Sequence, residues 1–175
     1  MTRRRRRGSG GRSGGKPEHY LRIAGAFMEK TVIISIKGTQ EYENAPPDTM
    51  ELVTQGWLQQ DGAGGFTLSY QESEVTGLEG TLTTFQVEAE RVTLMRFGEY
   101  NSQMVFQEGR RHLSMYDTPY GSMAIGVNTH RLRAELDERG GDIEIDYNLE
   151  IDHTVAGRNT FQIKVREADG VTLRQ

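Results

Sequence analysis

The chain of 175 residues contains no cysteine. Disulfide bonds, zinc fingers, iron–sulfur clusters and thiol nucleophiles are therefore excluded together. No stretch approaches about eighteen consecutive apolar residues, which excludes a membrane-spanning helix. The hydrophobic content of 35% is low but still that of a globular protein. The length suits one domain, or one domain with a tail, and is sufficient for a real core.

Catalytic and metal-binding signatures are missing as well. The four histidines stand in no zinc-binding spacing such as H-x-H or H-E-x-x-H, and no G-x-S-x-G motif occurs. Acidic residues alternate along 142–152, but they would lie along a straight strand face, whereas calcium requires roughly six to eight oxygens around one point. We interpret that row as a solvated exterior. We therefore expect no catalytic residues, no metal and no cofactor.

Positive charge is concentrated at the N-terminus. Residues 1–16 hold seven of the 21 Lys and Arg and no acid, so the rest of the chain combines 14 basic with 25 acidic residues, a net charge of −11. The segment 8–15 (GSGGRSGG) has no apolar group to bury. We predict that residues 1–27 are a disordered basic Arg/Gly-rich extension, with Met28 an alternative start, and that residues 28–175 are a single domain. Because the acidic body repels phosphate, any binding to nucleic acid would reside in residues 1–16.

From Thr31 onward, apolar residues recur with a period of two, as in half-buried strands. Turn-forming residues interrupt this pattern at 44–48, which contains two prolines, at 61–65, and at 156–158 before a final strand over 159–166. Strands every 8–12 residues predict an all-β sandwich or an up-and-down barrel. Further strands are expected at 49–60, 66–70, 81–88, 91–97, 102–107, 111–116, 121–128 and 142–152.

The segment 129–140 fits two structures. It has a possible N-cap, good helix formers and a final glycine, but its apolar residues also alternate. As a strand paired with 142–152, it would place Arg131 and Arg133 opposite the acidic row, which stabilises each pair by roughly 0.2–1 kcal/mol. We favour the strand.

Several polar residues continue strand faces that are otherwise apolar. Glu72 extends the face that carries Tyr70, and Arg96 extends the face of Val92 and Leu94, while Tyr116 and Tyr120 bracket a turn. Inside a barrel, an arginine beside tyrosine hydroxyls would bind a carboxylate or phosphate group through its bidentate fork. The alternative is that Glu72 and Arg96 lie near strand ends and reach solvent.

The order and spacing of four elements resemble the YwiB-like family of bacterial proteins of unknown function. The elements are 68–72 (LSYQE), 92–96 (VTLMR) with Gly98, 104–106 (MVF) with Gly109, and 116–121 (YDTPYG). The resemblance covers about residues 31–166. It implies a lipocalin-like (calycin) antiparallel β-barrel and a strand at 130–137. It implies no reaction, cofactor or catalytic residue.

The resulting hypothesis is a cytoplasmic, non-enzymatic, antiparallel up-and-down β-barrel that binds a small, partly apolar ligand. The residues expected to contact the ligand are Arg96, Tyr70 and Tyr116, with Glu72 and Tyr120 beside them. One alternative is a structural barrel that presents a face to another protein or to itself as a homodimer. Another is association with nucleic acid through the N-terminal arginines.

Overall fold

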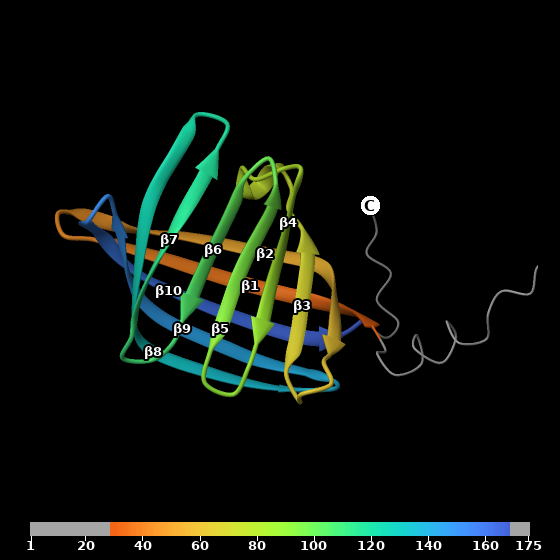
Figure 1. Cartoon of the computed structure of the whole chain (residues 1–175). Helices are drawn as coiled ribbons and strands as arrows, with labels where there is room; N and C mark the ends of the chain where they lie inside the picture. Colours follow the sequence, from red (N-terminus) through yellow and green to blue (C-terminus); the bar gives the residue numbers. More distant parts are fainter. Residues whose placement is uncertain (1–28, 169–175) are drawn as a thin grey trace, which may run out of the picture.

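The computed structural model describes residues 29–168, which form ten antiparallel strands and no α-helix (Figure 1). Each strand pairs with its neighbour in sequence, and β1 also pairs with β10, so the sheet closes into an up-and-down barrel. The predicted all-β antiparallel barrel is confirmed. The elements are β1 (Glu29–Tyr42), β2 (Ala45–Gln60), β3 (Phe66–Gln71), the short 3-10 helix η1 (Glu74–Thr76), β4 (Thr81–Val87), β5 (Val92–Gly98), β6 (Asn101–Phe106), β7 (Arg111–Thr118), β8 (Gly121–Asp137), β9 (Gly140–Ile151) and β10 (Thr154–Glu167).

The predicted disordered extension, residues 1–27, lies outside the described residues. Within residues 29–168 there is no long apolar helix of the kind that crosses a membrane.

The closed sheet has two parts of different strand length, which we call the short sheet (β3–β6) and the long sheet (β1, β2 and β7–β10). The short strands β3–β6 cross in front of long strands such as β1, β9 and β10 (Figure 1). The two sheets are joined by narrow seams: β2 pairs with β3 over only four residues, Trp57–Gln60, and β6 pairs with β7 only at Asn101 and Ser102. We call these the β2/β3 seam and the β6/β7 seam.

The core fills the space between the two sheets, because alternate side chains of every strand point inward. Phe85 and Leu94 come from the short sheet, and Ile34 and Ile145 from the long one, and all four are almost fully buried. Full burial of such a side chain stabilises the fold by about 1.5–3 kcal/mol. The alternation of apolar and polar residues in the sequence therefore corresponds to side chains that face the core and the exterior in turn.

Residues 130–137 belong to strand β8, as the alternation predicted. Arg131 lies opposite Asp146 of β9, and Arg133 lies opposite Glu144, so the basic and acidic rows face each other as expected. A strand is favoured over a helix here because one face is covered by the core while the other gains opposite-charge neighbours.

Two turns differ from the prediction. The β1–β2 turn is Glu43–Asn44, and Pro46 and Pro47 lie inside β2. They are tolerated there because that part of β2 pairs with β1 alone and the register shifts between Gln40 and Tyr42, as at a strand edge.

The second difference lies between β9 and β10. The turn is Asp152–His153, both at positive φ, and the predicted turn at 156–158 is a bulge within β10. The Asp152 backbone N–H donates to the Ala124 carbonyl at 2.9 Å, and its carboxylate accepts from the Ala124 N–H at 3.2 Å. These bonds stabilise the left-handed conformation, which aspartate adopts more readily than most residues.

Candidate functional site

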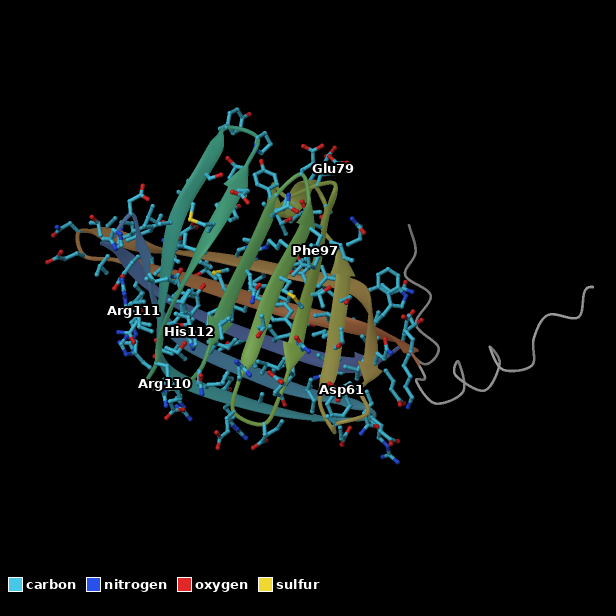
Figure 2. All side chains as sticks on the ribbon, in the orientation of Figure 1. Asp61, Glu79, Phe97, Arg110, Arg111 and His112 are labelled. Carbon is cyan, nitrogen blue, oxygen red and sulfur yellow. The ribbon has the colours of Figure 1, made fainter. Side chains whose placement is uncertain are left out.

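One row of inward-facing side chains crosses the short sheet and the β6/β7 seam. The register places its members directly beside one another, one on each strand from β3 to β7. We call this set the arginine row: Tyr70, Thr83, Arg96, Ser102 and Tyr116. Phe97, the next residue after Arg96, lies on the outer surface of the same sheet and is 54% exposed (Figure 2).

Arg96 is half-buried, and its guanidinium has no hydrogen bond or ion pair with any residue in 29–168. Its Nε is completely buried without a partner. The neighbouring Ser102 hydroxyl is also buried without a partner. The centre of the arginine row therefore presents hydrogen-bond donors for which this part of the chain provides no acceptor.

Glu72 lies one inward position beyond Tyr70 and is only 5% exposed, so it does not reach solvent as the alternative interpretation proposed. Its Oε1 accepts a hydrogen bond from the Thr83 hydroxyl at 2.5 Å, and its Oε2 accepts one from the Thr76 hydroxyl at 2.7 Å. Both carboxylate oxygens are thus engaged by hydroxyls, which offset the cost of burying the charge.

Three tyrosine hydroxyls lie within electrostatic range of Arg96. Burial raises the pKa of Tyr70, and the nearby Glu72 carboxylate raises it further, while Arg96 acts in the opposite direction. Burial also raises the pKa of Tyr116 and of Tyr147, again opposed by Arg96. These phenols stay protonated at neutral pH, and the Tyr70 hydroxyl is engaged by Glu72.

Tyr147 was not predicted from the sequence. It lies on β9, on the opposite sheet, and is 4% exposed, with its ring packed edge-on against Phe106 at 4.9 Å between centroids. The available signal was that it is the one polar side chain on the inward face of 142–152. Thr129 lies opposite it on β8, and its hydroxyl is buried without a partner in the described residues.

Tyr120 does not join this group. It lies in the β7–β8 turn, is 94% exposed, and its backbone N–H donates to the Thr118 hydroxyl. The structure therefore brings together four of the five residues singled out from the sequence, namely Tyr70, Glu72, Arg96 and Tyr116.

This site can recognise a ligand through its hydrogen-bond donors. A guanidinium offers a planar fork for two oxygens, and the surrounding hydroxyls offer further donors. In residues 29–168 there is no group of three or more His, Asp or Glu side chains arranged to hold a metal ion.

Comparisons with known proteins agree with this fold. A family model described as "Domain of unknown function (DUF1934)" matches residues 34–163. The crystal structure of the ywiB protein from Bacillus subtilis is similar to this chain with a TM-score of 0.73 and 22% sequence identity, over 83% of this chain and 98% of that one. At 22% identity, this similarity shows a shared fold and is limited to it. No curated protein matches the chain.

Proposed function

The chain belongs to the DUF1934 family, a domain of unknown function, and we propose that its barrel is a non-enzymatic binding module for a small, partly apolar ligand with an acidic head group. One observation carries the proposal: the Arg96 guanidinium lies in the barrel wall without a hydrogen-bond acceptor or counter-ion from residues 29–168. Leaving a buried donor unpaired costs about 1–3 kcal/mol, and a bound carboxylate or phosphate would remove that cost.

The surroundings of Arg96 favour an acid over a neutral ligand. Ser102 and Tyr116 flank it in the arginine row, and Tyr147 approaches it from the opposite sheet. Each of these side chains carries a hydroxyl that can donate a hydrogen bond. The one buried carboxylate in the described residues, Glu72, already accepts two hydroxyl hydrogen bonds.

The rest of the ligand would meet apolar side chains. Leu94 precedes Arg96 on the inward face of β5, and Met104 follows Ser102 on β6. Barrels of about eight strands, the lipocalins among them, commonly hold one small ligand against such an interior. We extend this calycin-like mode of binding to the present chain by analogy of fold.

The experiment is a calorimetric titration with octanoate, using octanol as the neutral probe. Octanoate should bind, and octanol should bind at least about tenfold more weakly, because a charge-assisted pair is worth about 1.5–3 kcal/mol. Arg96→Met should weaken octanoate binding by a similar factor. Arg91→Met removes the same charge from an exposed turn where Arg91 pairs with Glu88, so it should leave binding unchanged.

Two results would oppose the proposal. Equal affinities for octanoate and octanol would remove the acid preference, and unchanged octanoate binding in Arg96→Met would remove Arg96 from the site. Glu72→Gln provides an independent check, because loss of the nearby negative charge should tighten octanoate binding.

A second candidate function rests on the outer surface. A groove of 330 Å³ runs over β5–β7 and is lined by Met95, Phe97 and Met115, and also by Arg96 and Ser102 of the arginine row. Phe97 and Met115 are both more than half exposed, which is typical of contact surfaces and favours a protein partner or a homodimer. Light scattering tests the homodimer: Met115→Glu should convert a dimer to a monomer, and a monomeric wild type would exclude it.

Association with nucleic acid concerns residues 1–16, outside the described part of the chain. Its test is salt-dependent binding that is lost when those residues are deleted.

A further inference from the structure

A hollow opens on the inner face of the long sheet, and Tyr147 lines it whereas Arg96 does not. Its volume is 160 Å³, and its lining comes from β1, β2, β9 and β10. For comparison, a cavity of about 150 Å³ accommodates benzene. The hollow therefore has room for one ring or a short aliphatic group.

Two adjacent rows of side chains define this hollow. In the first, Gly38 lies between Met50 and Phe161, and a Cβ at Gly38 would already contact the Phe161 ring at 3.4 Å. The missing side chain of Gly38 therefore leaves an apolar recess between a thioether and an aromatic ring.

The second row contains Asp48, Gln40, Asn159 and Tyr147, which the register places side by side. It supplies a carboxylate and two amide carbonyl groups as acceptors. Asp48 has no ion pair or hydrogen bond with the described residues, and no lysine or arginine lines the hollow. Arg158, the neighbour of Asn159 on β10, is engaged by Asp146 at 2.5 Å.

The phenol of Tyr147 adds one more polar group to the hollow. The side chain is 4% exposed and lines the hollow, and its hydroxyl is not one of the completely buried atoms without a partner. The hydroxyl is therefore accessible from the hollow.

We propose that this hollow binds a small primary organic ammonium ion, with its ammonium group at Asp48, Gln40 and Asn159 and its apolar body over Gly38. An ammonium group has three donors, which match one carboxylate and two amide oxygens. The aromatic faces of Phe161 and Tyr147 also attract a cation. Arg96 does not line this hollow, but Tyr147 does and also lies within electrostatic range of Arg96, so the two proposed sites adjoin at Tyr147.

The test is an NMR titration of the full chain with benzylammonium, using benzyl alcohol as the neutral isostere. Benzylammonium should shift the amide signals of Gly38, Thr39 and Thr160 in a saturable way, and the alcohol should bind at least about threefold more weakly. Asp48→Asn should weaken benzylammonium binding by about three- to tenfold, the range expected for a partly solvated ion pair.

The matched control is Glu51→Gln, which removes the same charge from the outer face of the same strand, where Glu51 pairs with Lys37. It should leave benzylammonium binding unchanged. Arg96→Met should also leave it unchanged while weakening octanoate binding, so the two proposals can fail separately. Equal binding of the alcohol and the ammonium ion would overturn the proposal, as would an unchanged affinity in Asp48→Asn or the absence of saturable shifts with benzylammonium.

Discussion

Replacing Arg96 by methionine should make the barrel more stable while it weakens the binding of octanoate. The Nε of Arg96 is buried without a partner among the described residues, and such a donor costs about 1–3 kcal/mol. Methionine has a similar length, adapts to irregular packing and carries no donor. Part of this gain in stability is offset because Arg96 and the buried Glu72 carboxylate both act on Tyr70, so the variant also loses a positive charge near Glu72. The expected net gain in the free energy of unfolding is about 1 kcal/mol.

Urea and thermal unfolding of the wild type and Arg96→Met measure this difference. For a protein of this size, 1 kcal/mol corresponds to a rise in Tm of about 2–4 °C. The control, Arg91→Met, replaces an exposed arginine and should change the free energy of unfolding by less than about 0.5 kcal/mol. If Arg96→Met lowers the free energy of unfolding by about 1 kcal/mol or more, the reasoning is refuted. That result would mean that the protein already provides partners for the guanidinium.

Three further outcomes are expected. Gly56→Ala should lower the free energy of unfolding by about 1–3 kcal/mol, because its Cβ would lie 2.4 Å from a backbone oxygen, whereas Gly38→Ala, with its closest contact at 3.4 Å, should cost less in the same urea titration. Hydrogen bonding to an arginine lowers the pKa of Asp146, so Asp146→Asn should cost less than about 1 kcal/mol at pH 7, and urea unfolding at about pH 3 should show that difference shrinking. Burial raises the pKa of Tyr70 and Tyr147, so their phenolate absorbance should appear only on unfolding, and stability should fall above about pH 10.

The period-two pattern was sufficient to predict the fold class and the inward direction of most candidate residues. Arg96 follows Val92 and Leu94 on one strand face, and Glu72 follows Tyr70, so their common side could be inferred within each strand. The pairing of β8 with β9 could also be predicted, because opposite charges on Arg133 and Glu144 select that register.

The residue pairs between the other strands could not be predicted from charge or from alternation. No sequence pattern shows that Ser102 lies between Arg96 and Tyr116, because register depends on turn geometry and on packing across the barrel. Tyr147 was missed because its partners lie on the opposite sheet. The turn at Asp152–His153 was missed because neither residue is glycine, although both have positive φ.

The two polar rows inside the barrel lie on different parts of its wall. The arginine row reaches the β6/β7 seam at one of the two residue pairs that join those strands, Ser102 with Tyr116. The second row includes Asp48, on the part of β2 that extends beyond its pairing with β3. In the middle of the barrel, where apolar side chains from both sheets meet, the interior is closed by residues such as Phe85 and Ile145. The donors of the arginine row thus reach the β6/β7 seam, whereas Asp48 lies at the far end of β2 from the β2/β3 seam. The two sites that we propose, one for an acid and one for an ammonium ion, therefore draw on different parts of the barrel wall.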